Sequence, residues 1–162
     1  MEYYKSKEEA LNEFIETAKE YLKEVIKICE KRERENYRCE GLLPDSAKLI
    51  LAYEIMFNGS RKPEEVGIHY VKRILPYSEQ IEKRQESFFL DNNNLYPDVA
   101  PEHIEFIKKL WKNEDGFGFT DKQKQISWEY FEKMIESVSA WNEFLIYESK
   151  LKTRSNKSKS SK

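Results

Sequence analysis

Long apolar segments are absent from this sequence, and glycine and proline are scarce. No run of about 18 consecutive apolar residues occurs, so the sequence predicts no membrane-spanning helix. Only 5 glycines and 5 prolines are present among 162 residues, which is few for a fold made of many short strands and turns. No apolar signal segment follows the first residues, so we expect an intracellular protein.

Cysteine and histidine, the residues most useful for metal binding and nucleophilic chemistry, are also rare. The two cysteines, Cys29 and Cys39, match no metal-binding or redox spacing, and we expect two free thiols. Neither His69 nor His103 has a second histidine or a cysteine at ligand spacing. No phosphate-binding loop or catalytic motif occurs. The sequence therefore predicts no catalytic residue, no metal and no cofactor.

Charged residues are abundant at 36% of the chain, and aromatic residues reach 14%. This balance is typical of helices that have one apolar stripe and a charged outer face. We expect an all-α protein: a single-domain bundle of about six helices at residues 1–149, followed by a disordered basic tail at residues 150–162.

The first expected helix, residues 7–36, has apolar residues spaced alternately four and three positions apart. They are Leu11, Ile15, Ala18, Leu22, Val25 and Cys29. This seam indicates either a helix that faces the core of a bundle or a helix that pairs with a second copy. The next segment, residues 47–57, is apolar almost all round, and we expect it to be buried on most sides. We expect Asp45 or Ser46 to cap the first turn of this helix.

Further helices are expected at residues 63–75, 78–90, 101–112 and 121–149. The last begins with a capping box formed by Thr120 and Gln123. Its inner stripe is expected to contain Ile126, Tyr130, Met134, Val138, Trp141 and Leu145. Trp128 lies on a mixed face, so it is interpreted either as an edge of the core or as an anchor for a protein partner.

Basic residues gather at the end of the chain, where no acidic residue occurs. They are Lys150, Lys152, Arg154, Lys157, Lys159 and Lys162. The other 149 residues hold 22 basic and 30 acidic side chains. An acidic body does not favour nucleic-acid binding through the folded surface, whereas the tail is a candidate for phosphate contacts. A solubilising tail without a partner is the alternative.

Three segments together carry a resemblance to a known group. They contain the patterns Arg84-x-Glu86-x-Phe88-Phe89, Leu110-Trp111 at a helix end, and Lys122-x-x-x-Ile126-x-Trp128-x-Tyr130. This order resembles small helical proteins of unknown function encoded by large nucleocytoplasmic DNA viruses. The resemblance covers residues 81–131 and implies a viral protein associated with the virion or the viral factory, without implying any site residue.

The functional interpretation combines these features. We expect a non-enzymatic helical interaction or structural protein, with a protein partner or self-association. A nucleic-acid-associated protein that uses the basic tail is the first alternative. An enzyme with an unrecognised carboxylate or histidine site is the second.

Overall fold

The computed structural model describes residues 4–35, 43–59, 61–95, 101–114 and 116–160, without the side chains of Asn93, Glu102, His103 and residues 155–160. Within these residues all regular secondary structure is helical and no strand occurs, which confirms the all-α prediction. The α-helices are α1 (Lys7–Arg34), α2 (Asp45–Tyr53), α3 (Pro63–Arg73), α4 (Ser78–Glu82), α5 (Glu86–Asp91), α6 (Pro101–Lys112) and α7 (Asp121–Ser160). Shorter π- and 3₁₀-helical segments are η1 (Glu54–Asn58), η2 (Leu75–Tyr77) and η3 (Asn93–Leu95).

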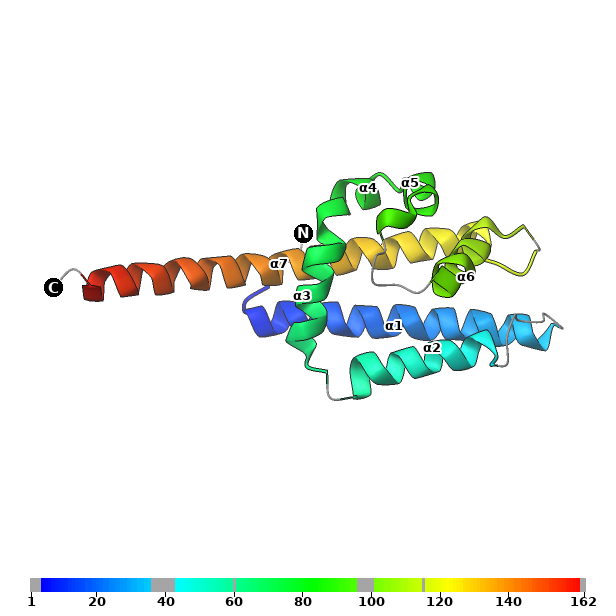
Figure 1. Ribbon diagram of the computed structural model, residues 1–162, viewed down its shortest axis with the longest axis horizontal. Coiled ribbons are helices and arrows are strands. Elements are labelled where there is room, and N and C mark those ends of the chain that lie inside the picture. The colour runs from blue at the N-terminus through cyan, green and yellow to red at the C-terminus, as the bar shows by residue number, and fades with distance from the viewer. Residues whose placement is uncertain (1–3, 36–42, 60, 96–100, 115, 161–162) are drawn as a thin grey trace.

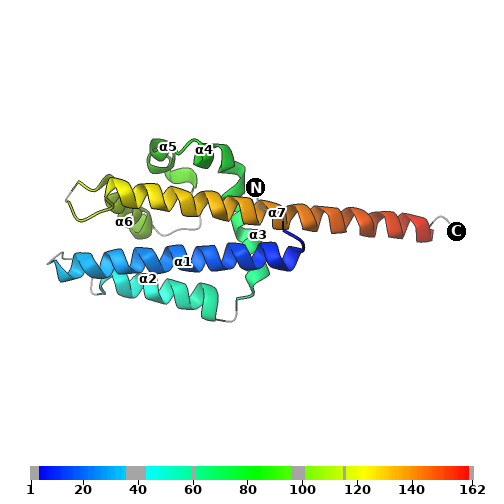
Figure 2. The same cartoon turned by 180° about the vertical axis from the view of Figure 1, so that it is seen from behind.

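Two long helices, α1 and α7, form the centre of the fold and lie side by side in both views (Figures 1 and 2). Helix α2 packs along the outer side of α1. Helix α3 crosses the pair, in front of α7 in Figure 1 and behind it in Figure 2. The segments α4 and α5 lie on the side of α7 away from α1, and α6 lies next to the first turns of α7 (Figure 1). In the described part of the chain, no helix is long and apolar enough to cross a membrane.

The seam of α1 faces the core of the single chain. Ser6 caps this helix, because its hydroxyl accepts a hydrogen bond from the Glu9 backbone N–H at 3.1 Å. Leu11, Ile15 and Val25 are buried together with residues of α7 or α3. The core-facing interpretation is therefore confirmed, and the seam is not exposed for pairing with a second copy.

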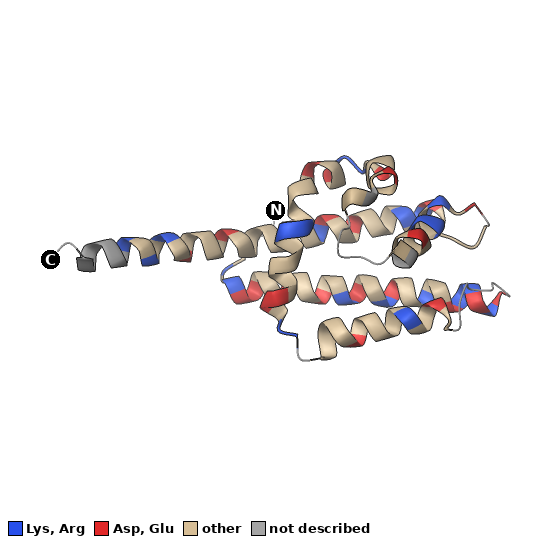
Figure 3. Ribbon diagram, viewed as in Figure 1, with Lys and Arg blue, Asp and Glu red and all other residues tan. Residues whose placement is uncertain are grey.

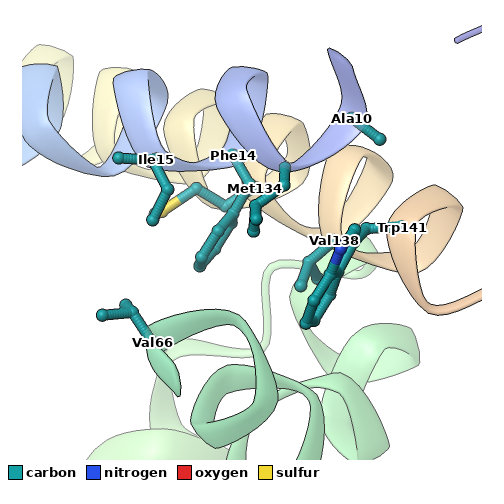
Figure 4. Close-up of a cluster of buried hydrophobic side chains, with 8 residues drawn as sticks. Ala10, Phe14, Ile15, Val66, Met134, Val138 and Trp141 are labelled. Carbon is teal, nitrogen blue, oxygen red and sulfur yellow. The ribbon is translucent and has the colours of Figure 1, made fainter. Parts of the chain in front are cut away.

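Where α1, α3 and α7 meet, large side chains fill the core (Figure 4). Phe14 of α1 and Val138 and Trp141 of α7 are each at most 2% exposed. Gly67 lets α3 approach closely: a Cβ atom at this position would lie 2.7 Å from an outer-ring carbon of Trp141. The absence of a side chain at Gly67 therefore sets how closely α3 packs against α7.

The first turns of α7 belong to a second, mostly aromatic cluster. The capping box is confirmed, since the Gln123 N–H donates to the Thr120 hydroxyl at 3.1 Å and the Thr120 N–H donates to the Gln123 side-chain oxygen at 2.9 Å. The inner face then passes through Ser127 and Trp128, both buried, whereas Ile126 is 37% exposed. The prediction that Ile126 lies on the inner stripe is therefore wrong. The aromatic cluster covers the neighbouring face of α7 and buries the larger indole of Trp128 there.

The prediction that residues 47–57, which form α2 and most of η1, are buried on most sides is wrong. Ile50, Leu51 and Ile55 are 44%, 54% and 61% exposed. Among the described elements, only α1 lies along the length of α2 (Figure 1), so exposed apolar side chains remain on the outward half of α2. Its N-cap is Pro44 rather than Asp45 or Ser46.

The ends of two other elements also differ from expectation. The segment expected as one helix at 78–90 is divided into α4 and α5 at Arg84, whose φ is 51°. The helix expected to end at residue 149 continues to Ser160, so the residues expected as a disordered tail are helical up to that point. No glycine or proline occurs in α7, and lysine and arginine are good helix formers.

Candidate functional site

Trp128, the candidate partner anchor, is buried within the chain and only 8% exposed. Its ring centroid lies 5.4 Å from that of Trp111, 5.7 Å from that of Phe131 and 6.1 Å from that of Phe89. These contacts join α5, α6 and α7 around the indole. Trp128 therefore occupies the edge of the core, and its ring is not displayed to a partner in this conformation.

The candidate phosphate-contacting residues lie on the last turns of α7. We name residues 146–160 the arm, because most of this part of α7 extends past the other elements in both views (Figures 1 and 2). Near its start, Glu148 forms an ion pair with Lys7 of α1 at 3.0 Å. Lys150, Lys152 and Arg154 are exposed there, and basic residues colour its described end in Figure 3. The side chains of Lys157, Lys159 and Lys162 lie outside the described residues.

Apolar residues are exposed on the arm as well. Ile146, Tyr147 and Leu151 are 48%, 63% and 46% exposed. Tyr147 and Leu151 line a shallow depression together with Lys150 and Arg154. These four residues form one face of the helix, which we name the arm face. Lys152 points away from it, since an α-helix turns by about 100° per residue.

An open groove of about 950 Å³ lies along α7 where the arm joins the body. Its apolar lining consists of Tyr4, Ile81, Ile135, Ala140, Phe144 and Tyr147. Its polar lining consists of Glu82, Glu132, Glu136, Ser139 and Glu143. The groove is thus lined by apolar side chains and carboxylates, and it is formed by residues from the N-terminal segment, α4 and α7.

Packing and one ion pair hold α4, the wall of this groove, against α7. Ile81 is 4% exposed and belongs to the second core cluster. Arg84, just after α4, donates to both carboxylate oxygens of Glu132, at 3.0 and 3.4 Å. The pKa of the Arg84 guanidinium is raised, first of all by this hydrogen bond. Glu132 is therefore already engaged within the chain.

The other carboxylates of the groove have no such partner. Glu82, Glu136 and Glu143 are exposed, and no cation of the described part of the chain forms an ion pair with them. Their charges therefore produce a negative potential along the groove. The described residues contain no group of three or more histidine, cysteine, aspartate or glutamate side chains arranged to hold a metal ion.

The groove and the arm face lie on the same side of α7. Glu136, Glu143 and Tyr147 of the groove are spaced by seven and four residues, which places them along one face. Lys150 and Arg154 continue this face at intervals of three and four residues. One face of a single helix is thus acidic over the body and basic over the arm.

Buried ionisable groups elsewhere serve packing. Burial raises the pKa of the Cys29 thiol to about 12, and Cys29 is only 1% exposed. Burial also raises the pKa of Tyr21 to about 12, and its hydroxyl donates to the Ser127 hydroxyl at 3.2 Å. A thiol held protonated is a poor nucleophile. Cys39 and the side chain of His103 lie outside the described residues, and His69 is exposed on α3.

A polar contact ties the start of α2 to the end of α1. The carboxylate of Glu33 accepts hydrogen bonds from the Ser46 backbone N–H at 3.0 Å and from its hydroxyl at 2.7 Å. This carboxylate satisfies a backbone donor in the first turn of α2, where Pro44 supplies no side-chain cap. Burial raises the pKa of the adjacent Asp45, and the charges of Lys48 and Arg32 oppose that shift. This arrangement positions the start of α2 against the end of α1.

Comparisons of the chain with protein-family models, curated proteins and solved structures find no match. The arm and the groove are the features of the described chain that bear on its function. Sequence reasoning identified the charges of the arm but missed the groove. The available signal was the series of Glu132, Glu136 and Glu143 on one helix face, interrupted by the small residues Ser139 and Ala140.

Proposed function

We propose that this chain is a non-enzymatic interaction protein whose binding element is the arm of α7. One observation supports this proposal above the others: the arm extends past every other element and exposes Tyr147 and Leu151 beside basic side chains. Exposed aromatic and apolar residues next to arginine are the composition of protein-binding surfaces.

The energetics of an isolated helix support the same proposal. A helical segment of about 15 residues without tertiary contacts is only marginally stable in water. The arm has this length, and apart from the ion pair between Glu148 and Lys7 of α1 at 3.0 Å its described side chains are largely exposed. A partner that covers the arm face would bury its apolar residues and stabilise the helix. Binding and full helix formation are therefore expected to occur together.

The contacts favour an interaction protein over the alternative of an enzyme. The carboxylates of the groove are exposed, whereas general acids and bases are usually placed in sites that exclude water. The groups with the largest pKa shifts, Tyr21, Tyr70 and Cys29, lie within the core.

Photo-crosslinking in cells that produce the full chain tests this proposal. A benzoylphenylalanine residue replaces Tyr147 or Leu151 on the arm face, and in the control it replaces Lys152 on the opposite face. We expect discrete protein adducts from positions 147 and 151 and few or none from 152. Equal adduct yields at all three positions, or no adducts, would refute the arm as a binding element. The adduct mass shows whether the partner is this chain.

The exposed basic residues favour a second candidate, a nucleic-acid-associated protein. Lys150, Lys152 and Arg154 are solvated on a helix that stands apart from the acidic body. Contacts with phosphates would be sensitive to salt and independent of sequence. Deleting residues 150–162 should abolish retention of DNA or RNA at low salt. Unchanged retention after this deletion would exclude the tail as the contact.

The resemblance of residues 81–131 supports a viral origin and a place in the virion or the viral factory as part of the same proposal. The expected setting is then the host-cell cytoplasm. Mass spectrometry of purified virions and of isolated factories tests this part directly. Detection in neither fraction of infected cells that produce the chain would contradict it.

A further inference from the structure

We propose that the arm of one copy docks into the groove of a second copy, so that two copies pair through antiparallel α7 helices. This inference rests on the proposed function, because it names the partner of the arm. Each copy would supply one arm and one groove, and a two-fold axis would relate the two contacts. Such an interface closes on itself and gives a dimer.

The charges of the two surfaces are complementary. The groove carries Glu136 and Glu143, which have no cation partner in the part of the chain that the structure describes. The arm face carries Lys150 and Arg154, both exposed. Opposite charges across an interface steer association and fix the register of the two partners. A second copy therefore provides cations for the carboxylates of the groove and carboxylates for the cations of the arm face.

The spacing along α7 defines a register. In an antiparallel pair, the residue number rises along one helix while it falls along the other. The residue numbers of each facing pair therefore have the same sum. Placing Lys150 of one copy opposite Glu143 of the other puts Arg154 opposite Ser139. Arg154 then lies between Glu136 and Glu143 of the other copy. The two-fold axis then passes between Ile146 and Tyr147. The sequence has a further lysine at position 157, seven residues after Lys150, as Glu136 is seven residues before Glu143.

The side chains in the groove suit a docked helix. Ser139 and Ala140 are small, which permits close approach of a second helix backbone. Phe144 and Tyr147 flank this low point with apolar surface, and Leu151 of the incoming arm face is 46% exposed before docking. Docking would bury this apolar surface between two rows of opposite charge.

The arm cannot occupy the groove of its own chain. Both surfaces lie on one continuous helix, and α7 contains no glycine or proline at which the chain turns back. The arm can fill this groove only from another molecule. This constraint, together with charge complementarity, favours a second copy over an unrelated basic helix.

Charge-reversal variants of the full chain test the proposal. One variant, E136K/E143K, makes the groove basic, and another, K150E/R154E, makes the arm face acidic. Both alter exposed side chains, so circular dichroism should show an unchanged helix content. Each alone should self-associate about a hundredfold more weakly than the wild type in sedimentation experiments, because like charges would face each other in both contacts.

Mixing these two variants provides the decisive step. The basic groove of one then meets the acidic arm of the other, and the remaining groove and arm have their native charges. We expect heterodimers of near wild-type affinity, and the quadruple variant should self-associate again. The matched control K122E/K152E changes the net charge as much as K150E/R154E does, but away from the arm face. It should dimerise within a factor of a few of the wild type.

Three results would overturn the docking proposal. They are a wild-type chain that stays monomeric at high micromolar concentration, a dimer unaffected by charge reversal, and mixed variants that do not pair. These failures are distinguishable from failure of the proposed function. A monomeric chain that still cross-links through positions 147 and 151 to a protein of another mass refutes the docking proposal and leaves the arm as a binding element.

Discussion

The contact between Gly67 and Trp141 gives a stability prediction whose sign depends on the geometry. A methyl group added at Gly67 would lie 2.7 and 3.0 Å from two outer-ring carbons of Trp141 and 3.2 Å from a Leu11 methyl carbon. Carbon atoms in contact are normally about 3.5–4.0 Å apart. Trp141 is 2% exposed, so its ring has little room to move (Figure 4).

Two effects oppose each other in Gly67→Ala. Alanine is more favourable than glycine in a helix interior by about 1 kcal/mol. Overpacking a filled core costs about 1–3 kcal/mol, and a clash with a buried ring at 2.7 Å places Gly67→Ala in the upper half of that range, at about 2–3 kcal/mol. We therefore expect a net loss of about 1–2 kcal/mol in the free energy of unfolding, measured by urea denaturation with circular dichroism.

A double-mutant cycle with Trp141→Phe isolates the clash. Phenylalanine lacks the two outer-ring carbons that approach Gly67, so Gly67→Ala in this background should stabilise the protein by up to about 1 kcal/mol. The coupling energy between the two positions is then about 2 kcal/mol. If Gly67→Ala stabilised both backgrounds equally, α3 would not approach Trp141 as described, and the reasoning would be refuted.

Three further predictions concern the capping box, the outer face of α2 and the buried thiol. Thr120→Ala should lower the free energy of unfolding by about 1 kcal/mol, while Thr120→Ser, which keeps the hydroxyl, should have little effect in the same urea assay. Leu51→Lys should change stability by less than about 0.5 kcal/mol, whereas Leu110→Ala in the core should cost about 2–5 kcal/mol; a large cost at Leu51 would mean that α2 is covered. In a Cys39→Ser background, Cys29 should react with a thiol reagent only after unfolding. Its folded pKa of about 12 exceeds the ordinary value of 9.0, so its contribution to stability is complete below pH 9 and is lost as the pH rises toward 12; rapid labelling of the folded chain near neutral pH would contradict this placement.

Local patterns predicted the elements that depend on local interactions. The stripe of α1 and the capping box of α7 were readable because each depends on residues close together in the sequence. The exposure of α2 could not be predicted in this way, because an apolar composition does not indicate which faces of a helix another element covers. Ile50 and Leu51 are exposed since only α1 packs along this helix.

The candidate site was predictable only in part. The basic residues of the arm were evident from the sequence, but its helical state was not, because polar composition suggested disorder and only the absence of glycine and proline favoured a helix. The groove has no local signature. Tyr4, Ile81 and Glu143 come from three distant segments, and the fold alone brings them together.

The distance between two copies of α7 tests the central claim most directly. A nitroxide spin label at the exposed Lys133 position, in a Cys39→Ser background with the buried Cys29 retained, reports the separation between copies by pulsed electron paramagnetic resonance. With a two-fold axis between Ile146 and Tyr147 and a rise of 1.5 Å per residue, two antiparallel helices place the labels about 40 Å apart. We expect this distance in the wild-type background and in the quadruple charge-swapped variant, and its loss in E136K/E143K. A separation below about 20 Å, as parallel helices with an interaxial distance of 8–10 Å would give, or no dipolar signal at any concentration, would contradict the account.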